Sequence, residues 1–131
     1  MANEISISTA ISGQKNGVTV SGSKSYTQTI QTTLGIVYHT EQVVGTNKES
    51  LVTGDVSLSD ESILWLRNLD STHIVSAWCV SQQPPNFYIR PGETLGPIRV
   101  YGGQLASWSL QSATAASNVE VIIIEAGDPA S

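Results

Sequence analysis

Apolar and polar residues alternate along much of the chain with a period of two, which is typical of β-strands buried on one face. The pattern is clear near the start, where residues 4–8 and 17–21 alternate on either side of the turn-forming stretch 12–17. These segments predict a first hairpin. Further strands are predicted at residues 25–30, 35–44, 63–69, 73–80, 87–90, 98–101, 107–111 and 119–125.

Residues that favour turns separate these segments, notably at 84–86, 90–93 and 101–103. Only residues 112–117 are rich in helix formers, and this stretch is too short to hold a helix alone. A parallel α/β fold would need crossover helices of about a dozen residues. We therefore predict one all-β domain spanning residues 1–131, an antiparallel β-sandwich that is jelly-roll-like or a barrel, with about eight to ten short strands.

The segment 63–80 contains two apolar runs joined by Asn68, Leu69, Asp70, Ser71 and Thr72. Short polar side chains hydrogen-bond nearby backbone groups and stabilise chain reversals. The pattern predicts a hairpin through the core, with the two tryptophans of its arms on one face as anchors of the sandwich. Those tryptophans are residues 65 and 78.

Composition and charge exclude several classes of partner. The 131 residues include 11 acidic and six basic side chains, for a net charge of -5, and the basic residues are scattered singly. Phosphate binding needs several cations on one face, so nucleic acid is not expected. The sequence shows neither a signal peptide nor a long apolar segment, and we expect no membrane association. The single cysteine, Cys79, excludes an intrachain disulfide and suits a reducing compartment.

No set of residues indicates catalysis, a cofactor or a metal ion. A nucleophilic triad would need a base, and the only histidines are His39 and His73. His73 adjoins the predicted turn and is expected to be either solvated or hydrogen-bonded locally. Zinc needs three or four Cys and His ligands, which here show no close spacing. Cys79 lies in an apolar run and is predicted to be a core residue. Asp60 and Glu61 lack the spacing of a calcium loop and are expected to be solvated.

Two alternatives stay open on the residues alone. A pair of acids for glycoside hydrolysis can come from distant strands, although nothing singles out a pair. Exposed aromatic side chains bind sugar faces, but aromatic side chains more often lie in cores or interfaces. The candidates for such a surface are Tyr26, Tyr38, Tyr101 and Trp108.

Two stretches, "LVTGDVSLSDESILWLRNLDSTHIV" (51–75) and "NFYIRPGETLGPIRV" (86–100), resemble small virion proteins of tailed bacteriophages. The resemblance covers about residues 51–100, and the start "MANEI" also occurs in such proteins. The chain departs from the pattern at residues 59–62, where a glycine is common, and at His73, where an asparagine is common. The matching positions are Leu51, Gly54, Asp55, Val56, Asn68, Leu69, Asp70, Thr72, Val75, Pro91, Gly92 and Glu93.

The resemblance implies a structural component of the particle, either a capsid decoration (cement) protein or a tail, neck or fibre component that binds a receptor or glycan. Its partners would be the major capsid protein and copies of itself, with a homotrimer favoured at the local threefold points of the shell. It would lie on the capsid exterior after assembly in the host cytoplasm. Residues 1–8 and 126–131 are expected as arms that order on a neighbouring subunit. The predicted interface residues are Glu4, Ile5, Ile7, Tyr101 and Trp108.

Overall fold

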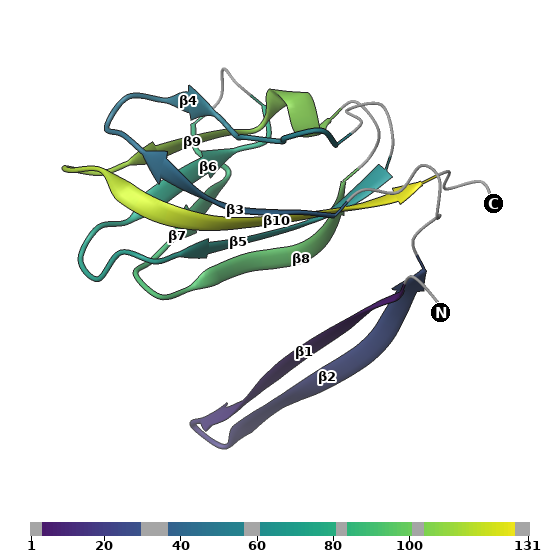
Figure 1. Cartoon of the computed structure of the whole chain (residues 1–131). Coiled ribbons are helices and arrows are strands. Elements are labelled where there is room, and N and C mark those ends of the chain that lie inside the picture. The colour runs from purple at the N-terminus through teal and green to yellow at the C-terminus, as the bar shows by residue number, and fades with distance from the viewer. Residues whose placement is uncertain (1–3, 30–36, 57–60, 81–83, 101–103, 128–131) are drawn as a thin grey trace.

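A computed structural model of the chain describes residues 4–29, 37–56, 61–80, 84–100 and 104–127. These residues form ten strands and one short 3₁₀ turn, and they include no α-helix (Figure 1). No helical segment of the described residues is long and apolar enough to span a membrane. The elements are β1 (Glu4–Lys15), β2 (Val18–Thr29), β3 (Val37–Val44), β4 (Glu49–Ser50), β5 (Glu61–Asn68), β6 (Val75–Trp78), β7 (Phe87–Ile89), β8 (Thr94–Val100), η1 (Leu105–Ser107), β9 (Ser109–Ser112) and β10 (Ser117–Gly127).

Two four-stranded antiparallel sheets pack face to face as a sandwich, in the orders β3-β10-β5-β8 and β4-β9-β6-β7 (Figure 1). Among β3 to β10, successive strands lie in different sheets except β6 and β7, which pair directly. This order is that of an eight-stranded jelly roll. The all-β sandwich predicted from the sequence is confirmed, whereas the barrel is not, because the two sheets do not close on each other.

The core lies between the two sheets and explains the alternation in the sequence. On β5 the side chains of Leu64 and Leu66 point inward, and on β10 those of Val119, Val121 and Ile123 do the same. The opposite sheet supplies its own inward residues at similar spacing. Successive side chains of a strand point to opposite faces, so each of these strands buries every second residue. Cys79 is partly buried and packs against this cluster.

The predicted hairpin at residues 63–80 is wrong. β5 pairs with β10 and β8, while β6 lies in the other sheet and pairs with β9 and β7. The polar residues between β5 and β6 therefore form a corner that carries the chain from one sheet to the other. A turn signal specifies a change of direction but not the sheet in which the next strand pairs.

The two tryptophans of this segment do not share a face. Trp65 lies on the outer side of β5, beneath the N-terminal hairpin. Trp78 follows the core residue Ala77 on β6 and so faces out of the other sheet, where Lys48 Nζ lies 4.4 Å from its ring centroid. The prediction of two tryptophans anchoring one core fails because each side chain lies on the outer face of its own sheet, and neither belongs to the cluster between the sheets.

The first hairpin is confirmed, but it is longer than predicted. β1 and β2 pair over 12 residues each, so that residues 12–15 belong to a strand. Residues 25–29 of the predicted strand 25–30 are part of β2, and residue 30 lies outside the described residues. Only Asn16 and Gly17 form the turn, with φ of 53° and 80°. Both angles are left-handed, as a two-residue type I′ turn requires, and Asn-Gly is the pair that adopts it most readily.

Candidate functional site

The β1–β2 hairpin is a two-stranded sheet with one apolar face and one hydroxyl face. Residues directly opposite each other in an antiparallel pair share a face, and the register places the odd residues of β1 opposite the even residues of β2. The apolar face carries Ile5, Ile7, Ile11, Val18, Val20 and Tyr26, together with Lys15 and Lys24. The other face carries mostly hydroxyls, and Ser8 and Ser25 form a hydrogen bond of 3.0 Å across it.

The base of the hairpin packs on the outer face of the β3-β10-β5-β8 sheet. Ile7 is buried there against Ile63 of β5 and Ile124 of β10, and Ile5 packs beside them. Arg99 of β8 ties the two parts together, because its guanidinium donates to Gln28 of the hairpin at 2.8 Å and to Glu61 at 2.5 Å. The hairpin is thus attached to the sandwich at one end only.

An apolar groove of about 230 Å³ lies between the hairpin base and the sheet. Its walls are the isoleucines of the hairpin base on one side and Trp65, Pro97 and Ile122 on the other. The hairpin therefore covers part of the outer apolar surface of the sheet and leaves the groove accessible.

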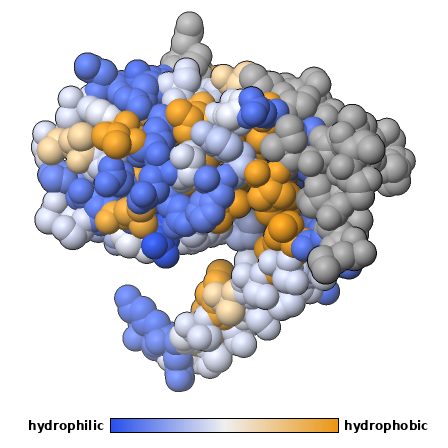
Figure 2. All heavy atoms as spheres, viewed as in Figure 1, coloured by the Kyte–Doolittle hydropathy of each residue, from blue (hydrophilic) through white to orange (hydrophobic). Residues whose placement is uncertain are grey.

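Beyond its base the hairpin leaves the sandwich. Every residue from 8 to 27 is exposed, and we call residues 9–24 the distal ribbon. Its apolar residues Ile11, Val18 and Val20 are 68%, 64% and 50% exposed. Figure 2 shows this part of the hairpin as a projection separated from the body by an open hollow. A lone two-stranded hairpin is marginally stable in water, so a ribbon of this length gains stability from any surface that covers its apolar face.

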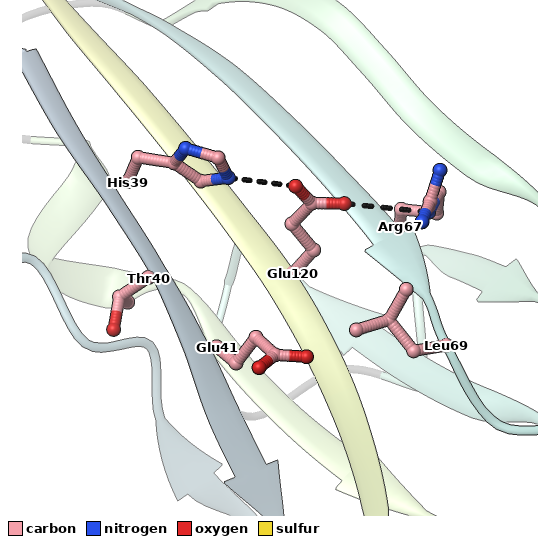
Figure 3. A pocket seen from close by; sticks show the side chains of 6 residues that line it. All are labelled: His39, Thr40, Glu41, Arg67, Leu69 and Glu120. Atoms are coloured by element: carbon pink, nitrogen blue, oxygen red, sulfur yellow. Dashed lines mark hydrogen bonds and ion pairs between the residues drawn. The ribbon is translucent and has the colours of Figure 1, made fainter.

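A polar cluster occupies the same outer sheet face beyond the groove (Figure 3). Glu120 of β10 lies in register with Glu41 of β3 and Arg67 of β5. Its carboxylate oxygens contact His39 Nε2 at 2.6 Å and Arg67 Nε at 3.3 Å. These residues and Leu69 line a shallow hollow of about 470 Å³. Three strands that are far apart in the sequence meet here, so no local motif signals the cluster.

The cluster has the geometry of cross-strand ion pairs on a sheet face. Both carboxylate oxygens of Glu120 are engaged by His39 and Arg67, which leaves the carboxylate occupied as an ion-pair partner. A hydroxyl or thiol nucleophile in contact with His39 would be needed for triad chemistry. Thr40 follows His39 in the sequence and carries a hydroxyl, and in Figure 3 its side chain points away from the His39–Glu120 pair. Within the described residues, no group of three or more His, Cys, Asp and Glu is placed to hold a metal ion.

The corner between β5 and β6 is built around Asp70. Its Oδ2 accepts hydrogen bonds from the backbone N–H of Thr72 at 2.8 Å and of His73 at 2.6 Å. The ring of His73 lies 2.8 Å from the same oxygen, so this histidine is hydrogen-bonded locally, which is one of the two states expected from the sequence. These bonds, led by the backbone N–H of Thr72, lower the pKa of Asp70 from 3.8 to about 2.

The lowered pKa of Asp70 makes part of the stability pH-dependent. The folded state holds its proton less tightly than the unfolded state, so the contribution is complete above the unfolded pKa of 3.8 and is lost as the pH falls toward about 2. We expect Asp70→Asn to unfold at lower urea concentration than the wild type above about pH 5, with a difference that shrinks between these two pKa values. Urea titrations of both proteins at a series of pH values measure it. A difference that is constant with pH would contradict this account.

The predicted interface residues lie in different places. Glu4 is exposed at the start of β1, Ile5 is partly buried and Ile7 is buried against the sheet beneath the hairpin. Residues 4–8 pair with β2, and the last predicted arm begins within β10, which ends at Gly127. Trp108 is 4% exposed and belongs to the core, where it stacks on Phe87. Tyr101 lies outside the described residues.

Sequence reasoning missed the residues that make the distal ribbon unusual, namely Ile11, Val18 and Val20. Its interpretation treated Val18 and Val20 as part of an ordinary half-buried strand. The signal that could have found them is the shared face, since a two-residue Asn16-Gly17 turn fixes the register and puts all three on one side. Whether another element covers that side is decided by packing, which the local pattern does not report.

Comparison with known proteins yields no match, whether with protein-family models, with curated proteins or with solved structures.

Proposed function

We propose that the chain is a structural protein of a virus particle, and that it acts as a capsid decoration (cement) protein. The observation that carries this proposal is the distal ribbon, whose apolar face is exposed to solvent and is not covered by any of the described residues. A surface of this kind is typical of proteins that assemble. The resemblance of residues 51–100 to phage virion proteins supplies the class of assembly.

Two further features support the proposal. The jelly roll is common among viral capsid domains, although it also occurs in lectins, so the fold is support by analogy. The polar clusters of the described residues have the geometry of ion pairs and turns, as at Glu120 and Asp70. Both features suit a protein that acts by binding to neighbouring proteins.

The mechanism is multivalent attachment. A symmetric oligomer placed across a junction between capsomers makes several weak contacts at once, and linked contacts raise the overall affinity well above that of each one. The partners are the major capsid protein and copies of this chain, with a homotrimer suited to the local threefold points of a shell. The position is the capsid exterior, after assembly in the host cytoplasm.

A second candidate is a tail, neck or fibre component that binds a receptor or glycan. Jelly rolls serve in lectins, and Tyr88 on the edge strand β7 is 67% exposed, as a sugar-binding aromatic would be. Trp108 has no exposed ring face to contribute. This candidate predicts few copies of the chain at one place on the particle.

Imaging of particles made with and without this chain tests the proposed function. We expect extra density at regular positions over the whole shell when the chain is present, and earlier release of the genome on heating when it is absent. Purified chain added back to bare particles should restore both the density and the heat resistance. Density confined to one vertex would replace the cement protein by the tail, neck or fibre component, and a chain absent from particles would remove both.

A further inference from the structure

The distal ribbon carries a pattern of its own on the apolar face. Ile11, Val18 and Val20 are flanked by Lys15 near the turn and by Lys24 toward the base. Residues 5–29 contain these two lysines and no acidic residue, for a charge of +2. The rest of the chain holds all 11 acidic residues and the other four basic ones, which gives -7. The ribbon and the body of the molecule therefore have opposite charge.

The outer face of the β3-β10-β5-β8 sheet carries the complementary pattern. Its apolar groove is lined by Trp65 and Ile122. The next row along the same strands carries Glu41, Glu120 and Arg67. Because both carboxylate oxygens of Glu120 are already bonded to basic side chains, the exposed Glu41 is the carboxylate of this row that a lysine of a second copy would meet. An apolar strip beside an exposed carboxylate matches an apolar strip flanked by lysines. The ribbon does not lie on this face in its own chain, because it diverges from the sandwich beyond the base (Figures 1 and 2).

We propose that the distal ribbon of one copy packs on the outer face of the β3-β10-β5-β8 sheet of a second copy. Ile11, Val18 and Val20 cover the groove at Trp65, and one of the flanking lysines lies beside Glu41. Burial of apolar surface supplies most of the affinity, and the opposite charges fix the orientation and speed the encounter.

The contact is a property of the isolated chain, and the proposed function gives it a purpose. Exchange of ribbons joins copies into the oligomer that a cement protein needs for avidity. The hydroxyl face of the ribbon points away from the contact. The same face of the hairpin carries the Ser8–Ser25 hydrogen bond just below the ribbon.

Sedimentation velocity over a range of concentrations tests the proposal. The wild type is expected to self-associate. The variant Ile11→Ser/Val20→Ser is expected to raise the dissociation constant about a hundredfold, on the order of tenfold for each apolar side chain withdrawn. Both residues are exposed in the single chain, so the unfolding midpoint at a concentration where both proteins are monomeric should be unchanged. The matched control is Ala10→Ser/Thr19→Ser on the hydroxyl face, which should associate like the wild type.

Charge reversal tests the orientation of the contact. Lys15→Glu/Lys24→Glu should weaken association, and the addition of Glu41→Lys to that variant should restore part of it. Added salt should weaken the self-association of the wild type, because it screens the attraction between lysines and carboxylates. The apolar contacts should depend less on the salt concentration. No rescue by Glu41→Lys would overturn the proposed location on the sheet face and leave the ribbon bound elsewhere.

A photoreactive residue in place of Ile11 shows where the ribbon lies. In a mixture of isotope-labelled and unlabelled chains, we expect cross-links between copies that join position 11 to β5 and β10. Cross-links within one copy would show that the ribbon folds back on its own sheet, and cross-links to the β4-β9-β6-β7 sheet would show that it binds another face; either result overturns the proposal. So does a wild type that stays monomeric at its highest soluble concentration. A monomeric chain that still decorates particles would support the proposed function and overturn the proposed contact. An oligomer that is absent from particles would support the contact and overturn the proposed function.

Discussion

Replacement of Asn68 by alanine is expected to lower the free energy of unfolding by about 3 kcal/mol, because two carbonyls lose their donor in a buried site. The side chain of Asn68 is fully buried at the end of β5. Its Nδ2 donates to the carbonyls of His73 and Ile89, both at 2.8 Å, and its Oδ1 accepts from the backbone N–H of Asp70 at 3.0 Å. The side-chain amide of Asn68, at the end of β5, thus connects this strand to the β5–β6 corner and to β7.

The backbone of Asn68 adds to this connection. Its N–H donates to Glu93 at 3.0 Å, and its carbonyl accepts from Gly92 at 2.9 Å, so the turn before β8 is bound to the same residue. A variant at this position therefore weakens the places where three strands from two sheets meet. We expect a large decrease in stability without a change of fold.

Urea unfolding followed by fluorescence measures the effect of Asn68→Ala. The matched control is Ser71→Ala, which removes an exposed polar side chain from the same corner and should change stability by less than about 0.5 kcal/mol. Asn68→Asp should be at least as damaging at neutral pH, since a carboxylate oxygen would replace the donor and face two carbonyls. Equal stability of Asn68→Ala and the control would show that the hydrogen bonds of this amide contribute nothing.

The strands were predictable from the sequence wherever one face is buried. β3 alternates between buried and exposed positions toward its end, so its pattern reports the burial directly. In β5 and β10 the alternation is interrupted at Ile63 and Ile124, which the N-terminal hairpin covers on the outer face. β4 was not predicted, because two residues are too few for a period to show. The stretch around Gly22 was interpreted as a break between strands, whereas β2 runs through it and pairs Gly22 with Ile11.

The partners of the strands were not predictable in the same way. β5 pairs with β10, about fifty residues further along the chain, and the alternation within β5 is the same whichever strand lies beside it. The corner at Asn68 and Asp70 has the composition of a hairpin turn, so a crossing between sheets and a return in one sheet give the same local signal. The jelly-roll order is therefore a property of long-range pairing.

The candidate functional residues show the same difference between local pattern, which the sequence reveals, and long-range pairing, which it does not. Ile5 and Ile7 were predicted at an interface between subunits. In the structure they lie on the face of the hairpin that packs against the sheet of the same chain. The cluster of His39, Arg67 and Glu120 depends on the register of three strands, and this register cannot be inferred from the sequence alone. The resemblance to virion proteins implied an assembly surface in general, and the register of the strands decides which side chains share one face.

Replacement of Trp108 by alanine is expected to have the largest effect, a loss of about 4 kcal/mol of unfolding free energy. Trp108 is buried between the sheets, with its ring stacked on Phe87 at a centroid distance of 5.7 Å and an interplanar angle of 4°. Alanine would leave a cavity that the surrounding strands fill only in part. Trp108→Phe keeps an aromatic ring in the site and should lose less than half as much stability.

The comparison of these variants separates a core role from a surface role for Trp108. Urea unfolding gives the stability of each, and sedimentation at low temperature gives the self-association of the fraction that stays folded. Because Trp108 lies in the core and the proposed contact uses the distal ribbon and an outer sheet face, Trp108→Phe should associate like the wild type. A stable Trp108→Ala variant with impaired association or glycan binding would instead make this tryptophan an interaction residue, and the packing described for the core would then be wrong.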